Sequence, residues 1–333
     1  MTHDHGRTTE HGGDLDRAIS RFGGQRADWL DLSTGINPHA FPLPQIENSL
    51  WTYLPDKGLQ QDVEAAAAAA YHTTRPCLAL AGAQQAIQLY PELFARYITG
   101  RRARVLHPSY NEHERQLLRQ NWQVERVCST DQLAGADLAV VVNPNNPDGC
   151  HSRPEQLFSL AEQVGVLVID ESFCDPLPHL SVCPHLTSQH DNILVLRSFG
   201  KFYGLAGLRL GFAVGPQACL DGLADMMGSW AVSGPALAVG KAALTDRKWA
   251  ADMTAQLAAE AEQLDRLVHA AGWQIVGGTS LYRLCQMKDA AAWQDHLAGH
   301  HIWTRAFSYN ANWLRLGLPP QTGWARLEQA LSG

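Results

Sequence analysis

Residues 192–211 read NILVLRSFGKFYGLAGLRLG, an apolar run that leads into a glycine-rich turn around Lys201. The run Asn192–Leu196 predicts a short buried strand. Ser198 precedes Lys201 by three residues, and Arg209 follows it by eight. A lysine amine can hold an aldehyde as a Schiff base, and a hydroxyl with an arginine suits a phosphate. Taken alone, Lys201 is better explained as a surface lysine than as the tether of a phosphorylated cofactor, so the rest of the chain must decide.

The composition is that of a globular protein with a large core. Hydrophobic residues make up 45% of the 333 residues and charged residues 18%, which argues against a disordered chain. The net charge of −7 argues against a surface that binds nucleic acid. No apolar run approaches the ~18 residues that span a bilayer, and the N-terminus lacks the pattern of a signal peptide. We therefore expect a cytoplasmic protein that binds neither nucleic acid nor membrane.

The cysteines and histidines indicate no metal site and no disulfide framework. The seven cysteines are scattered and contain no Cys-x-x-Cys pair, which is typical of reduced thiols. His3, His5 and His11 lie close together near the N-terminus, but no cysteine or carboxylate cluster joins them. The sequence therefore predicts a protein without a bound metal ion.

From about residue 75 short apolar runs alternate with helical stretches, which predicts an α/β fold with a mainly parallel sheet. The expected strands are Cys77–Ala81, Arg104–His107, Leu138–Asn143, Val166–Asp170, Ile193–Arg197 and Gly211–Val214. The expected helices are Gln60–Tyr71, Ala83–Ile98, Glu112–Gln120, Pro154–Gln163 and Gln217–Met226. We expect a large domain of residues 45–228 and a small domain of residues 1–44 and 229–333.

Residues with suitable chemistry follow several of the expected strands, where ligands of such sheets bind. Asp170 ends an apolar strand, and a buried carboxylate needs a positive or hydrogen-bonding partner such as a protonated pyridine nitrogen. The helix that starts after Gly82 could bind a phosphate with its free N–H groups. Tyr110 could stack on a flat ring, and Asn146, held by Pro147, could donate to a phenolic oxygen. Each residue alone also fits an ordinary turn, cap or packed aromatic.

Four motifs together resemble those of the fold-type I enzymes that use pyridoxal 5′-phosphate (PLP), the aspartate-aminotransferase-like proteins. In chain order they are Asn146-Pro147-x-Gly149, Asp170-Glu171-x-Phe173, Ser198-x-x-Lys201 and Arg209. The resemblance runs from about Leu32 to Leu316, nearly the whole chain. It implies a large domain with a mainly parallel sheet flanked by helices, a smaller α+β domain, and a homodimer with shared active sites.

The resemblance also implies a role for each site residue. Lys201 would hold PLP covalently and act as the catalytic residue. The other expected cofactor ligands are the Ala83 and Gln84 amides, Tyr110 on the ring face, Asn146 at the ring O3′, Asp170 at the pyridine nitrogen, Ser198 and Arg209 at the phosphate, and Tyr53 from the neighbouring subunit. The expected substrate ligands are His11, Ser33, Asn37, Arg305 and Arg315. Arg315 would clamp the substrate carboxylate, whereas Arg305 fits a phosphate ligand and a surface arginine equally well.

Two subfamilies share this compact form, the histidinol-phosphate aminotransferases and the threonine-phosphate decarboxylases. Residues 11–14 with 31–38, and Phe173 where the aminotransferases usually have a tyrosine, favour the decarboxylases. The implied reaction converts L-threonine O-3-phosphate to (R)-1-amino-2-propanol O-2-phosphate and CO2, for the nucleotide loop of cobalamin. The alternatives are transamination of histidinol phosphate and a non-catalytic protein that binds a corrinoid-biosynthesis enzyme. Such an enzyme is also a candidate partner for an active decarboxylase.

Two positions depart from the pattern of the family. Asp148 replaces the usual threonine of Asn-Pro-Thr-Gly, and Gln84-Gln85 replaces a more usual acidic pair. Neither position supplies the core chemistry. Gln85 does, however, leave open the shape of the expected phosphate site.

Overall fold

The computed structural model describes residues 12–332, which form two compact units. One spans His39–Leu257, and the other combines the described residues up to Pro38 with those from Ala258 onward. The domain limits expected at 44/45 and 228/229 fall inside the larger unit. Phe41 donates its backbone N–H to the Tyr203 carbonyl at 2.9 Å, and the helix Gly234–Thr245 packs against the helix Lys57–Ala70. These contacts assign both flanking segments to the larger unit.

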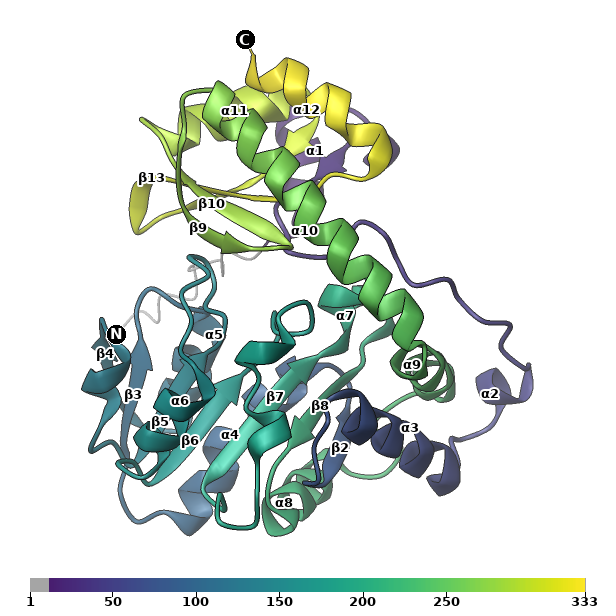
Figure 1. Ribbon diagram of the computed structural model, residues 1–333, viewed down its shortest axis with the longest axis vertical. Helices are drawn as coiled ribbons and strands as arrows, with labels where there is room; N and C mark the ends of the chain where they lie inside the picture. The colour runs from purple at the N-terminus through teal and green to yellow at the C-terminus, as the bar shows by residue number, and fades with distance from the viewer. Residues whose placement is uncertain (1–11, 333) are drawn as a thin grey trace, which may run out of the picture. The chain divides into compact units, whose positions relative to one another are not determined.

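A seven-stranded sheet forms the centre of the larger unit (Figure 1). In spatial order its strands are β2 (Cys77–Leu80), β8 (Gly211–Val214), β7 (Ile193–Ser198), β6 (Val166–Asp170), β5 (Leu138–Val142), β3 (Arg102–Leu106) and β4 (Gln123–Val127). In this sheet β8 runs opposite to the other six strands. The expectation of a mainly parallel sheet is therefore confirmed. The edge strand β4 was not expected, because its Gln-Val-Glu-Arg-Val sequence is mostly polar.

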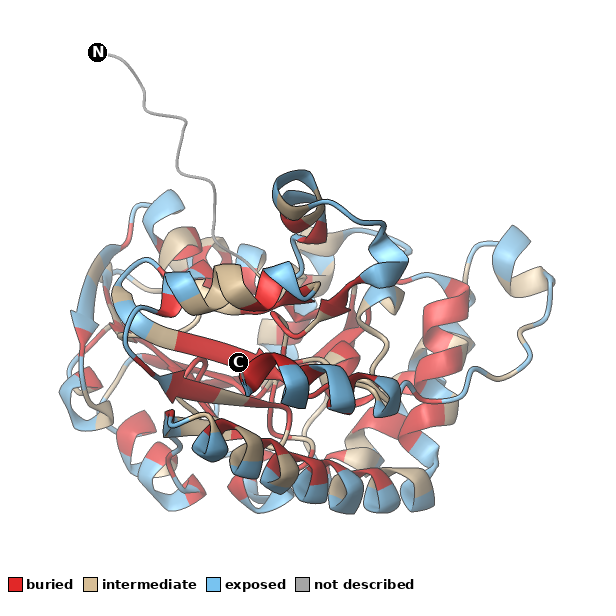
Figure 2. Cartoon of the chain, turned by 90° about the horizontal axis from the view of Figure 1, so that it is seen from above, coloured by how far each residue is buried: buried red, intermediate tan, exposed pale blue. Residues whose placement is uncertain are grey.

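Helices accompany the sheet. They are α2 (Ser49–Thr52), α3 (Lys57–Ala70), α4 (Ala83–Tyr97), α5 (Asn111–Arg119), α6 (Pro154–Ala161), α7 (Phe199–Phe202), α8 (Gln217–Met227) and α9 (Gly234–Thr245), and α10 (Arg247–Ala270) begins in this unit. Of these, α3 to α8 contact the strands of the sheet, α9 packs on α3, and the short α2 contacts α9. Figure 2 shows the buried residues in red along the strands and the inward helix faces. Ile87 and Leu93 of α4 belong to the same buried core cluster as Val140 and Leu194 of the sheet. Each such side chain contributes about 1.5–3 kcal/mol by its burial.

The smaller unit is built on a four-stranded antiparallel sheet. Its order is β12 (Arg305–Phe307), β13 (Asn310–Gly317), β10 (Tyr282–Gln286) and β9 (Gln274–Thr279). The remaining elements are α1 (Leu15–Phe22), α11 (Ala290–Gly299), α12 (Trp324–Leu331) and the parallel pair β1 (Leu30–Asp31) and β11 (Ile302–Trp303). The β1–β11 pair joins the N-terminal segment to the C-terminal part of the chain. Within residues 12–332, no helix is long and apolar enough to cross a membrane.

Candidate active site

Neighbouring strands of the larger unit bring the central residues of the expected site to one edge of the sheet. Asp170 is the last residue of β6, Ser198 is the last residue of β7, and Asn146 follows β5. The register pairs Asp170 with Leu196, two residues before Ser198. Lys201 lies within the short helix α7 that starts directly after β7. The parallel strands thus end where ligands of such sheets bind.

Asp170 is held as a buried carboxylate by two neighbours. It is 2% exposed, His113 Nε2 lies 2.9 Å from its Oδ2, and the Ser172 backbone N–H donates to its Oδ1 at 2.9 Å. The hydroxyl of Tyr90 lies 2.9 Å from the other ring nitrogen of His113. Burial alone would raise the pKa of Asp170, but the bonds from His113 and Ser172 outweigh it and lower the pKa below its ordinary value. A carboxylate that stays ionised in this way fits a protonated pyridine nitrogen of PLP.

His113, Tyr90 and Ser172 were not singled out from the sequence. Tyr110 immediately precedes α5 and His113 lies three residues later, so the two can share a helix face, and their rings lie 6.0 Å apart. Ser172 stands two residues after Asp170, a spacing at which aspartate often bonds its own backbone. The sequence spacing could therefore have suggested both His113 and Ser172. The contact between Tyr90 and His113 depends on the packing of α4 against α5, which no local pattern shows.

The start of α4 and Arg209 form a cradle that suits the phosphate of PLP. Gly82 adopts a φ of 83° before the helix, and no side chain caps it. The first amides of the helix, those of Ala83 and Gln84, have no partner within it. A Cβ on Gly82 would lie 2.8 Å from the Arg209 guanidinium, and a Cβ on Gly211 would lie 2.5 Å from the Ala83 nitrogen. Glycines thus keep the cradle open, and a phosphate there would meet N–H donors and a guanidinium.

The surroundings of the cradle hold it in place. Arg209 adopts a left-handed conformation with a φ of 56°, and its Nη1 donates to a carbonyl of the preceding turn at 3.0 Å. The Gln85 side chain accepts from the Ala81 N–H at 2.8 Å, so it braces the turn between β2 and α4. This bond gives Gln85 a role in the shape of the site, which the sequence left open. The sheet register pairs Ser198 with Gly211 beside the cradle.

Hydrogen bonds join the loop that carries Asn146 to the loop before α5. The Asn145 amide donates to Asp148 at 2.8 Å and accepts from the Ser109 hydroxyl at 2.6 Å. Asp148 also accepts from the backbone N–H of Cys150 at 3.1 Å. The aspartate that replaces the usual threonine therefore closes its own turn and positions Asn145, which in turn reaches the neighbouring loop.

Lys201 lies near an aromatic face. Its Nζ is 5.6 Å from the ring centre of Phe173, which is 4% exposed. A ring face attracts an ammonium group. Phenylalanine has no hydroxyl, however, so Phe173 cannot donate to the cofactor as a tyrosine there would.

A buried ion network lies next to these strand ends. Arg197 is 4% exposed and donates to Glu171 at 2.6 Å and to Asp175 at 2.7 Å. The Ser181 hydroxyl donates to Glu171 at 2.6 Å. Burial would lower the pKa of Arg197, but the charges of Asp175 and Glu171 outweigh it and raise the pKa well above its ordinary value. Because Glu171 follows Asp170 in the chain and Arg197 lies in β7, the network ties the two strand ends together.

Tyr53 lies apart from the other expected cofactor residues. It caps the short helix α2 and is 76% exposed. Among the described residues, its backbone N–H donates to the Ser49 carbonyl within α2, and no backbone hydrogen bond joins it to the cradle, Asp170 or Lys201. Trp51 and Leu54 beside it are 66% and 63% exposed. These side chains form an apolar surface around α2.

The smaller unit places two of the expected substrate residues opposite each other. Arg305 of β12 pairs with Arg315 of β13 in the register of the sheet. Arg315 is 2% exposed, and its Nη2 donates to the Ser33 carbonyl at 2.8 Å. Burial and the charge of Arg305 lower the pKa of Arg315 below its ordinary value. Like charges directly opposite each other destabilise a sheet, so an anion bound between these two cations would be stabilising.

The other expected substrate residues have different surroundings. The Ser33 hydroxyl donates to Asp31 at 2.6 Å and accepts from the Gly13 N–H at 2.7 Å. It therefore holds the N-terminal segment against the residues around β1. Asn37 is buried, with 2% exposed. His11 lies outside the described residues.

Comparisons with known proteins show the family and the fold of this chain. The family model described as aminotransferase class I and II matches residues 28–332. A threonine-phosphate decarboxylase of Sinorhizobium sp. is 42% identical over 329 residues, and one of Pseudomonas aeruginosa is 41% identical over 336 residues; each match covers 97% of both proteins. The solved histidinol-phosphate aminotransferase of Sinorhizobium meliloti in complex with pyridoxal-5′-phosphate has a TM-score of 0.79 at 18% identity, covering 95% of this chain and 93% of that one. That structure shares its fold with this chain.

Proposed function

Because this chain belongs to the aminotransferase class I and II family and uses PLP, we propose that it is a decarboxylase of L-threonine O-3-phosphate. The products would be (R)-1-amino-2-propanol O-2-phosphate, for the nucleotide loop of cobalamin, and CO2. Full-length relatives that carry the name threonine-phosphate decarboxylase support this reaction. The structural observation that supports it most is the pair Arg305 and Arg315, since the substrate carries two anionic groups.

Bound PLP supplies an electron sink for the electron pair that remains when a bond to the substrate Cα breaks. The residues of the larger unit hold and complement it. Asp170 keeps a negative charge for the pyridine nitrogen, the α4 amides and Arg209 receive the phosphate, and Lys201 provides the amine. A lysine amine can also return a proton to Cα after CO2 leaves.

The orientation of the substrate decides which bond to Cα breaks. Arg315 would hold the carboxylate with its planar fork, and Arg305 would hold the phosphate. Two fixed anionic ends leave the substrate little rotational freedom. Substrate orientation is therefore assigned to the smaller unit, and cofactor chemistry to the larger one.

Replacing Arg315 by lysine should raise the KM for threonine phosphate by roughly 10- to 100-fold, because a point charge cannot form the bidentate pair. Arg305→Gln should raise the inhibition constant of phosphoethanolamine, which has a phosphate but no carboxylate, whereas Arg315→Lys should change it little. Steady-state kinetics checks both. Arg326→Lys is the matched control, since Arg326 donates to a backbone carbonyl elsewhere in the same unit. If all three variants changed KM and the inhibition constant equally, the assignment of Arg315 to the carboxylate and Arg305 to the phosphate would be contradicted.

Transamination of histidinol phosphate is the alternative within the family. It requires 2-oxoglutarate as amino acceptor, whereas decarboxylation of threonine phosphate requires no keto acid. A non-catalytic corrinoid-assembly protein, the third candidate, would either show no visible PLP absorbance or still bind its partner after Lys201→Ala. Incubation with each substrate, followed by product analysis, distinguishes the three.

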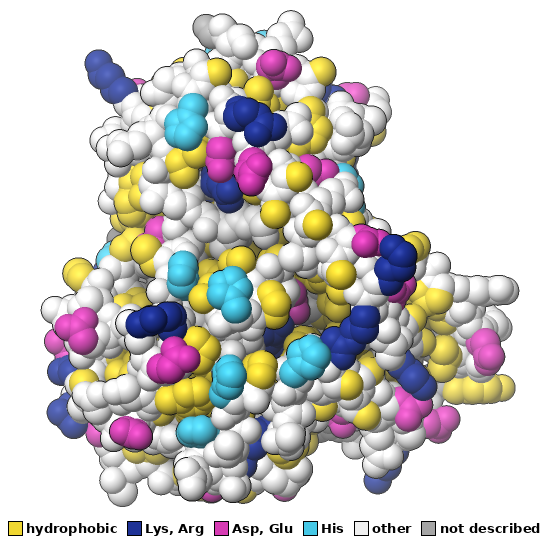
Figure 3. Space-filling model, viewed as in Figure 1, with side chains coloured by type: hydrophobic (Ala, Val, Ile, Leu, Met, Phe, Trp, Pro, Cys, Tyr) yellow, Lys and Arg dark blue, Asp and Glu magenta, His cyan; other side chains and the backbone are white. Residues whose placement is uncertain are grey.

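We further propose that a second copy of this chain covers the apolar surface around α2. Leu43, Trp51, Tyr53 and Leu54 in this segment are 64%, 66%, 76% and 63% exposed. Figure 3 shows hydrophobic atoms in yellow at the right-hand edge of the larger unit, over this segment. Four large apolar side chains so exposed are unusual for a monomer. A homodimer would also bring Tyr53 to the cofactor of the neighbouring subunit.

The double change Trp51→Arg with Leu54→Arg should therefore convert the dimer to monomers and weaken PLP binding by at least roughly tenfold. Light scattering coupled to gel filtration gives the mass, and titration of the apoenzyme gives the affinity. Leu118→Arg is the matched control, because Leu118 is also exposed but lies on α5 at the other edge of the sheet (Figure 1). A monomeric wild-type protein would refute the dimer.

A further inference from the structure

Glu112 is a buried carboxylate that the proposed reaction does not use. It lies in the first turn of α5 and is 4% exposed. It accepts hydrogen bonds from Gln84 Nε2 at 3.0 Å, from Gln116 Nε2 at 3.1 Å and from Arg115 Nη1 at 3.1 Å. An ionised carboxylate is costly to bury unless such partners surround it. The three bonds therefore mark a built position for this charge.

Gln84 connects Glu112 with Tyr110. Its Nε2 donates to Glu112, and its Oε1 accepts from the Tyr110 hydroxyl at 3.1 Å. An ionised carboxylate can only accept hydrogen bonds, so it must face the NH2 end of the Gln84 amide. The oxygen end is then left for the Tyr110 hydroxyl. Glu112 thus determines which way the Gln84 amide points and makes the Tyr110 hydroxyl a donor.

Both ends of this connection belong to the cofactor site. Gln84 is the second residue of α4, and its backbone amide is one of the N–H groups of the phosphate cradle. Tyr110 is the residue expected to stack on the ring. We propose that Glu112 is a positioning residue that, through Gln84, sets the Tyr110 ring and the first turn of α4 for PLP binding. The inference rests on the PLP site of the proposed function.

The connection also accounts for a departure from the family pattern. The resemblance to fold-type I enzymes implies an acidic residue at position 84, whereas this chain has glutamine there. An acidic side chain there would bring two carboxylates to hydrogen-bond distance, which is strongly unfavourable at a buried site. In this chain the glutamine at position 84 and the glutamate at position 112 are therefore a matched pair.

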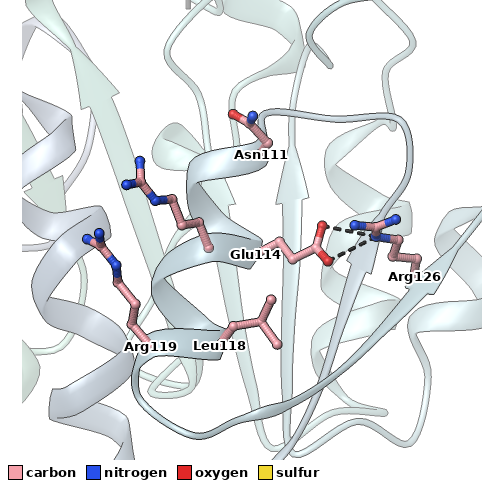
Figure 4. Close-up of a pocket in the computed structure, with 6 residues that line it drawn as sticks. Asn111, Glu114, Leu118, Arg119 and Arg126 are labelled. Carbon is pink, nitrogen blue, oxygen red and sulfur yellow. Dashed lines mark hydrogen bonds and ion pairs between the residues drawn. The ribbon is translucent and has the colours of Figure 1, made fainter. Parts of the chain in front are cut away.

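The outer face of α5 supplies a control. Glu114 forms two bonds with Arg126 Nε, at 2.9 and 3.1 Å, in an open groove of about 450 Å³ (Figure 4). Arg115 also lines this groove, so the Glu112 partners extend from the cofactor site to the surface. Glu114 carries the same charge as Glu112 and lies on the same helix. Its partner Arg126 lies on β4, however, and not at Gln84.

The first test compares Glu112→Gln with Glu114→Gln in the full-length protein. An amide at position 112 can donate as well as accept, so the Gln84 amide loses its preferred orientation. We expect Glu112→Gln to weaken PLP binding by the apoenzyme roughly 5- to 50-fold. The visible circular dichroism of bound PLP should fall and kcat should drop, while the KM for threonine phosphate changes little. Glu114→Gln should stay within about twofold of the wild type in PLP affinity.

The second test exchanges the two side chains, so that position 84 carries the glutamate and position 112 the glutamine. Gln84→Glu alone should weaken PLP binding more than Glu112→Gln, because it places two carboxylates together. Gln84→Glu combined with Glu112→Gln should recover affinity and circular dichroism at least in part. The new carboxylate at position 84 can accept from both Tyr110 and the new amide at position 112. In a Tyr110→Phe background, Glu112→Gln should produce little further change in the dichroism.

Three outcomes would overturn the inference. One is a Glu112→Gln protein that matches Glu114→Gln in PLP affinity and dichroism. Another is a lower denaturation midpoint with both cofactor signals unchanged, which would mean that Glu112 serves only the stability of the fold. The third is an exchanged pair that is worse than Gln84→Glu alone. Since affinity and dichroism are measured without substrate, these results stand whether the enzyme decarboxylates or transaminates.

Discussion

Lys201→Ala should lower the rate of CO2 release from threonine phosphate by at least about a thousandfold. The change removes both the amine that tethers PLP and the group that can return a proton to Cα. Asp170, the α4 amides and Arg209 remain, so PLP should still bind without the covalent link. Borohydride reduction followed by peptide mass spectrometry should leave the cofactor on the Lys201 peptide of the wild type and on no peptide of the variant.

Lys241→Ala is the matched control for Lys201→Ala. Lys241 pairs with Asp62 at 2.7 Å on the surface of the same unit, and its side chain is 47% exposed. Its replacement should leave the rate within about twofold of the wild type. A Lys201→Ala enzyme that retains more than a tenth of the rate, or a cofactor label on another lysine, would contradict the role of Lys201.

Arg197→Met should lower the free energy of unfolding of the apoenzyme by about 3–5 kcal/mol. The change leaves the carboxylates of Glu171 and Asp175 buried without their cation. Removing one partner of a buried ion pair costs much more stability than removing one partner of a surface pair, because the remaining charge stays desolvated. Urea denaturation of the apoenzyme, followed by intrinsic fluorescence, gives the change.

Arg96→Met is the control for this effect. Arg96 pairs with Glu92 on the exposed side of α4, and its side chain is 55% exposed. That change should stay within about 0.5 kcal/mol of the wild type. If the two variants unfold at the same urea concentration, the buried network has no special part in stability.

Much of the larger unit could be predicted from the sequence, because its central strands are buried and therefore read as continuous apolar runs. Leu138–Val142 and Val166–Asp170 are fully buried strands and were expected within one residue of their ends. β4 was missed because an edge strand can be polar. Two-residue strands such as β1 and β11 leave no pattern, since their pairing depends on contacts about 270 positions apart in the chain.

The site was predictable in part for a related reason. Residues at the carboxyl ends of buried strands, such as Asp170 and Ser198, are placed by the sheet itself, so their position in the sequence suffices to suggest them. The partners that set their properties come from helix packing. His113 acts on Asp170, and Glu112 on Gln84, across more than 25 positions of sequence. Side-chain contacts of this kind follow from the three-dimensional arrangement and leave no local motif.

The most direct test of the proposed function uses L-threonine O-3-phosphate labelled with ¹³C at its carboxyl carbon. The PLP-loaded enzyme, without any keto acid, should release one molecule of ¹³CO2 for each molecule of aminopropanol phosphate formed, over many turnovers. The opposite result would be no labelled CO2 from threonine phosphate, together with turnover of histidinol phosphate only when 2-oxoglutarate is present. That result would identify the enzyme as an aminotransferase and contradict the proposed decarboxylation.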